Sequence, residues 1–281
     1  PHTTHMIALG LKRRLDIPWL ADFRDPWTNI DWFDKLPLMK SSIRKHKRME
    51  MSVLRTADKV LSVSNSWSNE FKEMSEREVI TITNGFAPED YDDMNVHTED
   101  EGFVILHTGS LNGDRNPLAL WEFLEKEITQ NSFLKERLKI RFIGAVDFQV
   151  ITSINEAGLG SYFEHTQFVS HSEAIEEMYA ASVLLLPLNN APNMMGIIPG
   201  KLYEYLAVNK PILAIGPKEG DAAVILNEFE GTHVIDFDEK LEWKNLRAIT
   251  EQRIDRSEKL TKYSRKHLAK EVSKHLESIL N

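Results

Sequence analysis

Two kinds of hydrophobic pattern alternate along most of the chain. Short runs that are apolar almost throughout have the length of strands, and the longer segments between them repeat apolar residues at helical spacing. The first pattern predicts strands over 17–23, 59–63, 78–82, 103–107, 139–143, 183–187, 211–215 and 232–235. The second predicts helices over 36–56, 65–73, 117–130, 148–157, 172–181 and 200–207. A helical tail is expected over 240–279, with an apolar face made of Leu241, Leu246, Ile249, Ile254, Leu260, Leu268, Val272, Leu276 and Ile279.

This order of elements predicts an α/β fold with parallel sheets flanked by helices. Strands without polar alternation are buried on both faces, as in parallel sheets covered by helices. The polar, acidic stretch from 88 to 101 interrupts the pattern and reads as a linker. We therefore expect two Rossmann-like lobes at 1–90 and 102–260, a linker at 91–101, and a C-terminal helix at 261–281 that packs back on the first lobe. In such sheets ligands bind beyond the carboxyl ends of the strands.

Composition narrows the possible functions. A length of 281 residues suits about two domains. The chain contains no cysteine, which excludes disulfides, thiolate metal sites and a cysteine nucleophile. Of the net charge of −9, residues 1–90 contribute 14 Lys/Arg against 13 Asp/Glu, which leaves 20 against 30 for the remainder. So acidic a second half argues against a nucleic-acid surface. Because the sequence begins Pro-His-Thr-Thr-His, we expect a segment to precede it.

A glycine-containing loop at 107–115 follows the first strand of the second lobe. Glycine at 109 lets the backbone approach an anion, Ser110 offers a donor, and Arg115 would add a charge-assisted contact to a diphosphate. A plain strand-to-helix turn has the same residue requirements, so both interpretations stand. The loop matches neither the dinucleotide fingerprint nor the P-loop.

A second candidate is the segment 193–207. A helix is expected to begin near Pro199, which places Lys201 in its first turn and Glu204 one turn later. Free amides and Lys201 at this start suit an anion, and the Glu204 carboxylate suits two vicinal hydroxyls. The alternative is a solvated Lys–Glu pair of little energetic weight.

The sequence GKLYEYLAVNKPILAIG at 200–216 resembles the donor-site signature of family-4 glycosyltransferases of the GT-B fold. FIGAV at 142–146, ASVLLLPL at 181–188 and IPWLADFRDPW at 17–27 resemble the same family at its usual intervals. The resemblance implies an enzyme that moves a sugar from a UDP- or GDP-type donor to a glycan or lipid-linked acceptor, with retention of configuration. It also implies no other cofactor, a bacterial polysaccharide pathway and a cytoplasmic location.

The resemblance also implies roles for particular residues. The diphosphate would contact Gly109, Ser110, Leu111 and Arg115, with Lys201 as a second positive charge and Glu204 on the ribose. Backbone near Ile198 and Gly200 would contact sugar and phosphate, and Val169 the nucleobase. Two departures are visible. No lysine follows Arg115, and Gly196 stands where many members carry a first glutamate.

On the acceptor side, the resemblance points to Arg24 and Asp25 as catalytic residues that face the cleft, with His2 and His5 nearby. An Arg–Asp pair that only fixes its loop is the alternative. No Asp-x-Asp pair ends an apolar strand, and Lys201 and Arg115 would stabilise the leaving diphosphate, so we expect transfer without a metal. The basic cluster at 35–48 indicates either peripheral membrane contact at the inner face or a solvated helix face.

Two other functions remain open at this point. A sugar-nucleotide epimerase or hydrolase shares two Rossmann-like lobes and would act without an acceptor. A non-catalytic module would hold a nucleotide or a partner without turnover, and the two departures from the family pattern favour it.

Overall fold

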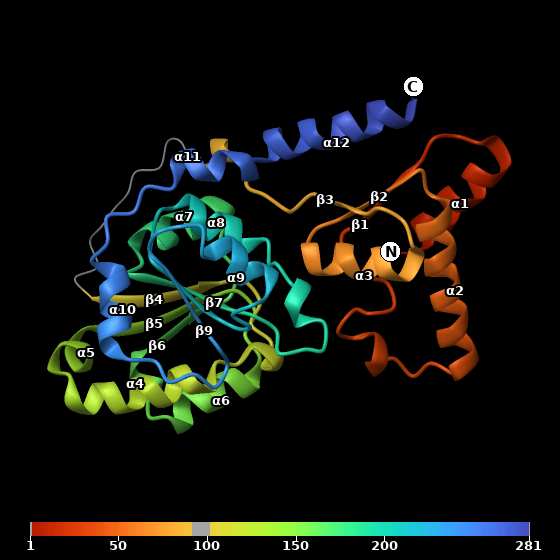
Figure 1. Cartoon of the computed structure of the whole chain (residues 1–281). Coiled ribbons are helices and arrows are strands. Elements are labelled where there is room, and N and C mark those ends of the chain that lie inside the picture. The colour runs from red at the N-terminus through yellow and green to blue at the C-terminus, as the bar shows by residue number, and fades with distance from the viewer. Residues whose placement is uncertain (1, 92–101, 281) are drawn as a thin grey trace. The chain divides into compact units, whose positions relative to one another are not determined.

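The computed structural model describes residues 2–91 and 102–280, and these divide into two compact units (Figure 1). The first unit comprises Pro1–Gly85, Ala191–Ile198 and Lys262–Asn281, and the second comprises Phe86–Asn190 and Pro199–Thr261. Each unit contains one parallel sheet flanked by helices, which confirms the predicted fold class. The predicted linker at 91–101 lies outside the described residues except for Tyr91.

The second unit is built on a six-stranded sheet in the order β6-β5-β4-β7-β8-β9, with all neighbours parallel. Its strands are β4 Phe103–Thr108, β5 Leu138–Ile143, β6 Phe163–Thr166, β7 Val183–Pro187, β8 Ile212–Ile215 and β9 Thr232–Ile235. Every residue of β4, β7 and β8 is buried, whereas the edge strand β6 is mostly exposed. Full burial explains why β7 and β8 are apolar throughout and β4 is apolar up to Leu106.

Helices cover both faces of this sheet. They are α4 Leu118–Gln130, α5 Ser132–Arg137, α6 Phe148–Glu156, α7 His171–Ala180, α8 Lys201–Ala207, α9 Asp221–Leu226, α10 Trp243–Thr250 and α11 Ser257–Leu260. Figure 1 shows α4, α5 and α6 on one face and α7, α8 and α9 on the other. Short 3₁₀ turns occur at Pro88–Asp90, Gly113–Arg115 and Gly160–Tyr162.

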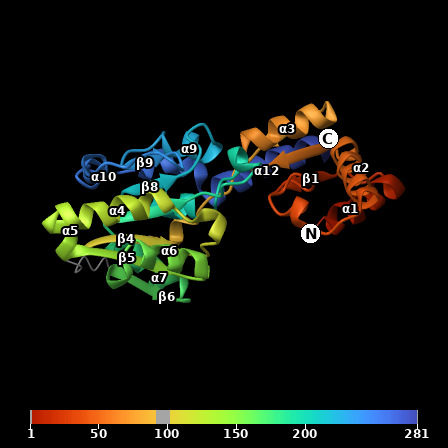
Figure 2. The same cartoon turned by 90° about the horizontal axis from the view of Figure 1, so that it is seen from below.

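The first unit has a three-stranded parallel sheet in the order β1-β2-β3. Its strands are β1 Leu20–Phe23, β2 Lys59–Ser62 and β3 Ile80–Thr81, and its helices are α1 Thr3–Leu15, α2 Lys40–Thr56, α3 Asn65–Ser75 and α12 Arg265–Leu280. Further 3₁₀ turns lie at Phe33–Lys35, Met194–Gly196 and Thr261–Tyr263. Figure 2 shows α1, α2 and α3 gathered around the short sheet. A separate core of buried side chains, among them Phe23, Trp27 and Phe71, joins these elements.

The predicted strands are all present, with small shifts of their ends. The structure adds elements that the pattern did not reveal: α1, α5, α9 and β6. β6 has the sequence FEHT and only Phe163 among its residues packs on the core, so it carries neither an apolar run nor a clear alternation. The predicted helix at 36–56 begins only at Lys40.

The continuous helical tail predicted over 240–279 is wrong. The chain forms α10, breaks, forms the short α11 and a 3₁₀ turn, and then forms α12. Leu246, Ile249 and Leu260 are buried as expected, but α12 has no buried residue and Leu276 is 41% exposed. The chain is not helical at 251–255, so apolar residues on either side of this break do not share one helix face.

Within the described part of the chain, no helix combines the length and the apolar character needed to cross a membrane.

Candidate functional site

The candidate site of the second unit lies at the carboxyl ends of β4 and β7. These neighbouring strands mark the point where the strand order reverses, because β5 continues the sheet on one side of β4 and β8 continues it beyond β7. Ligands of open α/β sheets bind in the crevice at such a point. The loop after β4 carries Gly109 and Arg115, and α8, which follows β7 in the chain, carries Lys201 and Glu204.

The loop after β4 is held by backbone hydrogen bonds to the loop after β5. Gly109 has φ +106°, a backbone conformation that residues with a Cβ atom rarely adopt. The Leu111 N–H donates to the Ala145 carbonyl at 2.8 Å, and the Leu111 carbonyl accepts from the Asp147 N–H at 2.9 Å. Leu111 is fully buried, so it shapes the loop and has no main-chain donor left for a diphosphate. Ser110 is exposed beside it.

Gly109 and Lys201 are in direct contact across the site. A Cβ atom at Gly109 would lie 2.1 Å from Cε and 2.8 Å from Nζ of Lys201. The missing side chain therefore makes room for the lysine, whose ammonium lies against the loop backbone. Two segments about ninety residues apart, each predicted separately as an anion site, are therefore in contact.

α8 is aligned on this loop by a buried phenol. The hydroxyl of Tyr205 accepts a hydrogen bond of 2.9 Å from the N–H of Thr108, the last residue of β4, and lies 3.4 Å from the Thr108 Oγ1. Burial raises the pKa of Tyr205 to about 12, so the phenol keeps its proton. Glu204 is half-buried on the same helix, and no ion pair joins it to Lys201 among the described residues. The solvated Lys–Glu pair considered from the sequence is therefore not what the structure shows.

Burial also sets the charges beneath the loop. His107 is fully buried and its Nδ1 lies 3.0 Å from the Leu185 carbonyl. Burial lowers the pKa of His107 to about 4, and the nearby charges of Lys201 and Arg115 act in the same direction. Burial lowers the pKa of Lys201, while the Glu204 carboxylate opposes that shift. The site thus gathers positive charge over a neutral imidazole.

Arg115 and Asn116, at the end of the loop after β4, are both held by side-chain hydrogen bonds. Arg115 Nε donates to the Asn189 side-chain carbonyl, which fixes the guanidinium at the end of β7. The next residue, Asn116, makes two side-chain hydrogen bonds of its own. Its Oδ1 accepts from Trp121 Nε1 and its Nδ2 donates to Ser153 Oγ, each at 2.8 Å. Asn116 therefore joins α4 to α6 and is not directed at an anion.

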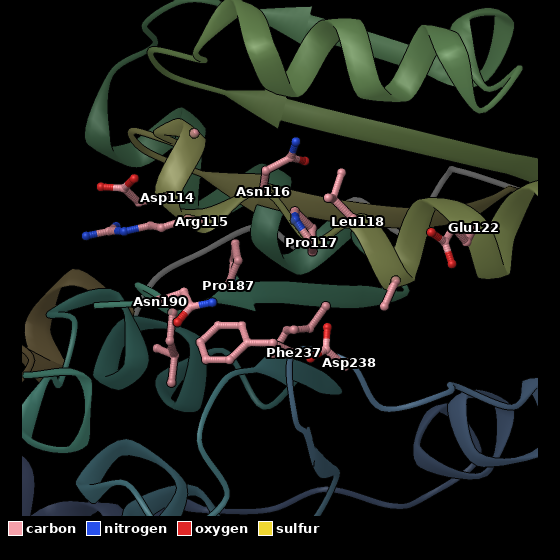
Figure 3. Close-up of a pocket in the computed structure, with 14 residues that line it drawn as sticks. Asp114, Arg115, Asn116, Pro117, Leu118, Glu122, Pro187, Asn190, Phe237 and Asp238 are labelled. Atoms are coloured by element: carbon pink, nitrogen blue, oxygen red, sulfur yellow. The ribbon is translucent and has the colours of Figure 1, made fainter. Parts of the chain in front are cut away.

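Arg115 also lines a cavity of about 480 Å³ between the first turn of α4 and the ends of β7, β8 and β9 (Figure 3). Figure 3 shows Asp114 and Arg115 extending side by side at one end of it, with Glu122 towards the other end. Phe237 and Asp238 form the wall below. No pattern in the sequence predicts this cavity, because its walls come from four loops separated in the chain.

The second departure has a steric cause within the first unit. Gly196 packs against the indole of Trp67, and a Cβ atom there would lie 2.3 Å from Trp67 Nε1. No glutamate fits at this position unless the tryptophan moves. The tryptophan was not identified from the sequence as part of any site.

The acceptor-side candidates lie in the loop after β1. The guanidinium of Arg24 donates a hydrogen bond to the Asn84 side-chain carbonyl. Burial raises the pKa of Asp25; the charge of Arg24 opposes the shift and Asp31 adds to it. The hydrogen bond of Arg24 therefore ties this loop to the segment after β3, and the simple Arg–Asp hydrogen-bonded pair is not found.

His2 and His5 stack on aromatic residues. The centre of the His2 ring lies 4.5 Å from that of Trp27, with the two ring planes nearly parallel, and the centre of the His5 ring lies 4.4 Å from that of Phe23. Burial lowers the pKa of His2 to about 4 and also lowers the pKa of His5. Both imidazoles are thus neutral at pH 7 and serve the packing of the first unit.

A buried carboxylate that sequence reasoning missed supports the same loop. Glu50 is 1% exposed and accepts hydrogen bonds from the Trp27 N–H at 3.0 Å and the Thr28 N–H at 3.3 Å, besides the Thr28 hydroxyl. Burial raises its pKa. An acidic residue inside a helix gives no sequence signal of this kind.

The remaining candidates are positioned by loops. Val169 is half-buried between β6 and the capped start of α7, Gly200 is the exposed residue before α8, and Ile198 is buried in the first unit. In the described ranges, no three His, Asp or Glu side chains are grouped as metal ligands would be.

The basic side chains of the second unit thus lie where open parallel α/β sheets bind their ligands. A family model described as "Glycosyl transferases group 1" matches residues 91–267, more than half of the chain. The chain belongs to this family of glycosyltransferases. No curated protein matches it.

Solved structures share the fold at low sequence identity. Sucrose-phosphate synthase from Thermosynechococcus elongatus matches with a TM-score of 0.72 and 12% identity, over 99% of this chain and 71% of that one. An α,α-trehalose-phosphate synthase (UDP-forming) from Burkholderia vietnamiensis matches with a TM-score of 0.63 and 10% identity, over 96% and 69%. WaaG, a glycosyltransferase involved in lipopolysaccharide biosynthesis, matches with a TM-score of 0.59 and 14% identity, over 88% of this chain and 72% of that one.

Proposed function

We propose that the chain binds a nucleotide-diphosphate sugar at the loop after β4 and α8, and transfers its sugar to a glycan or lipid-linked acceptor. The observation that carries the proposal is the contact of Lys201 with Gly109, next to a loop that ends in Arg115. Lys201 fills the space beside the Gly109 backbone, and both Lys201 and Arg115 lie near enough to His107 to lower its pKa. A diphosphate suits two such cations in charge.

The proposed chemistry depends on charge development at the leaving group. As the bond between the sugar and the diphosphate breaks, negative charge grows on the diphosphate, and Lys201 and Arg115 stabilise it. Partial burial strengthens this interaction compared with water. We infer transfer with retention of anomeric configuration and without a metal, as the family resemblance implies. Glu204 holds the ribose hydroxyls and Val169 the base.

The acceptor is proposed to meet the loop of Arg24 and Asp25, in a cytoplasmic enzyme that contacts the membrane peripherally. The raised pKa of Asp25 and its neighbour Arg24 suit a hydroxyl that must be oriented and deprotonated. For the donor, UDP is the first choice, because a trehalose-phosphate synthase of the same fold is described as UDP-forming.

The test is a calorimetric titration of the chain with UDP, GDP and their common sugar conjugates, with and without a chelator. We expect micromolar binding of one nucleotide, unchanged by the chelator. Glu204→Ala should weaken it about tenfold or more, which corresponds to about 1.4 kcal/mol for a lost charged hydrogen bond. Glu125→Ala, an exposed residue on α4, is the matched control and should bind as the parent does.

Two results would contradict the proposal. If Glu204→Ala binds nucleotide with the affinity of the parent, the Glu204 carboxylate is not part of the donor site. If the parent binds no nucleotide, the assignment of the donor site itself is wrong. Tight binding without turnover on any acceptor would instead favour the non-catalytic module.

A further inference from the structure

Arg256 is the most deeply buried basic residue of the second unit and lies far in sequence from the candidate site. It follows the break after α10 and is 1% exposed. Its Nε and Nη2 donate to the Glu230 carbonyl at 3.0 and 2.7 Å. Nη2 also donates to the Lys210 carbonyl at 3.1 Å, and Nη1 donates to the Leu206 carbonyl at 3.4 Å. One guanidinium therefore joins the end of α8, the turn before β8 and the turn before β9.

A buried arginine without a carboxylate partner is an unusual way to hold loops together. The described residues provide no hydrogen bond from this guanidinium to a carboxylate, and all its acceptors are backbone carbonyls. Burying an ion is costly unless it is fully hydrogen-bonded. Burial lowers the pKa of Arg256 to about 10, so the side chain remains charged at neutral pH. The guanidinium has five N–H donors in a rigid planar fork, whereas a lysine has three on a single nitrogen, so the arginine reaches carbonyls of separate segments more readily.

The carbonyl of Leu206 belongs to the last turn of α8. That helix has only seven residues, too few to be stable without tertiary support. At its end, Asn209 adopts a left-handed conformation with φ +51°, and its side-chain carbonyl accepts a hydrogen bond of 3.0 Å from the Arg256 N–H. The same helix is joined to the end of β4 by Tyr205. α8 is thus fixed both beside the glycine loop and at its carboxyl end.

We propose that Arg256 is a positioning residue for the donor site, which holds α8 so that Lys201 and Glu204 keep their places beside the Gly109 loop. The inference rests on the proposed function for its ligand. Arg256 itself touches no reacting group. Its effect is transmitted through one short helix, whose last turn it caps.

The experiment compares Arg256→Met, Arg256→Lys and a matched core variant in the full chain. Leu134→Ala serves as the control, because Leu134 is fully buried on α5, away from α8, and its truncation also destabilises the fold. Two quantities are measured well below the unfolding temperature of each variant. They are hydrogen exchange of the backbone amides at 201–210 without ligand, and affinity for UDP and GDP by calorimetry.

We expect faster exchange at 201–210 and at least tenfold weaker nucleotide binding in Arg256→Met, an intermediate effect in Arg256→Lys, and neither change in Leu134→Ala. Parental exchange and affinity in folded Arg256→Met would overturn the proposal. If Arg256→Met does not fold, Asn209→Gly is the second variant. It keeps the left-handed turn and removes the acceptor of the Arg256 backbone N–H. It should show faster exchange at 201–210 and weaker nucleotide binding, both to a smaller extent.

Failure of the proposed function is distinguishable from failure of this inference. If the parent binds no nucleotide, the donor site assignment fails. The exchange measurement still decides whether Arg256 holds α8, and unchanged exchange in Arg256→Met would overturn the positioning role by itself.

Discussion

Gly109 has the most demanding backbone of the candidate site. Its φ of +106° lies outside the usual left-handed helical region, and the space where a side chain would stand is filled by Lys201. Two independent requirements therefore coincide at one residue. The sequence indicated a glycine that could approach an anion, but only the structure shows which side chain approaches it.

Gly109→Ala should lower the free energy of unfolding by about 1–3 kcal/mol, through backbone strain and the clash with Lys201. It should also weaken nucleotide binding, because the lysine must move. Gly158→Ala is the matched control: Gly158 also has positive φ, at +70°, but nothing lies within 4 Å of its Cβ position. Chemical denaturation and calorimetry measure both quantities, and equal losses in the two variants would refute the steric contribution of Lys201.

The buried His107 should make the free energy of unfolding depend on pH. Its pKa is about 4 in the folded state against 6.5 in the unfolded chain, so the unfolded state binds more protons between these values. Stability is therefore lost as pH falls through this window. The contribution of His107 is about 2 kcal/mol between pH 7 and pH 5.

His107→Gln should reduce the fall in unfolding free energy between these two pH values by that amount. The other histidines with lowered pKa are the same in both proteins, so they cancel in the comparison. The measurement is urea denaturation at pH 5, 6 and 7. Identical pH slopes in parent and variant would show that His107 is not kept neutral by burial.

Among the elements, α8 combines a functional face with anchors at two points. Its first turn carries Lys201, its centre carries Glu204 and Tyr205, and its last turn is capped by Arg256. The motif in the sequence identified this helix, and the resemblance supplied roles for its polar residues. The two anchors were not predicted, because Thr108 and Arg256 are distant along the chain.

Tyr205→Phe tests the anchor at β4. Removal of the hydroxyl leaves the buried Thr108 N–H without an acceptor, which should cost about 1–3 kcal/mol of unfolding free energy. Tyr162→Phe is the control, because its hydroxyl makes only an exposed hydrogen bond of 3.3 Å to the Lys135 carbonyl. Its expected change is within about 0.5 kcal/mol. Equal stability of Tyr205→Phe and the parent would mean that another group satisfies the Thr108 amide.

For the molecule as a whole, the basic cluster predicted at 35–48 belongs to a groove of the first unit. A cavity of about 440 Å³ between α1 and α2 is lined by Arg13, Lys45 and Arg48 together with apolar side chains. Beside it, α1 exposes an apolar stripe at i, i+4 spacing: Ile7, Leu11 and Leu15 are 61%, 47% and 62% exposed. Cations beside exposed apolar side chains suit the interface of an anionic membrane.

Sedimentation with vesicles tests the proposed membrane contact. The chain should bind vesicles that contain anionic phosphatidylglycerol and should not bind neutral phosphatidylcholine vesicles, because the lipid charge is the attraction. Lys45→Gln with Arg48→Gln should reduce binding about tenfold or more, at about 1 kcal/mol for each charge. Lys126→Gln with Lys135→Gln in the second unit makes the same change of net charge and should have no effect. If both double variants bind anionic vesicles equally well, the attraction depends on net charge alone and not on the groove between α1 and α2.

The sequence by itself determined the class of the fold. Fully apolar strands such as Val183–Pro187, separated by helices, predict buried parallel sheets because both faces of each strand must be covered. The motif at 200–216 and its spacing from the other motifs also predicted the glycosyltransferase family, and the family match over residues 91–267 confirms it. These properties are local, so they can be read from neighbouring residues.

Tertiary structure alone decided which of these residues meet. The contact of Lys201 with Gly109, the exclusion of a side chain at Gly196 by Trp67 and the capping of α8 by Arg256 all join segments far apart in the chain. Only close packing fixes such distances, since a periodic pattern says which face is buried and not what is buried against it. For the same reason the pattern predicted one apolar helix over 240–279, whereas the chain breaks after α10 and forms α12 as a separate helix.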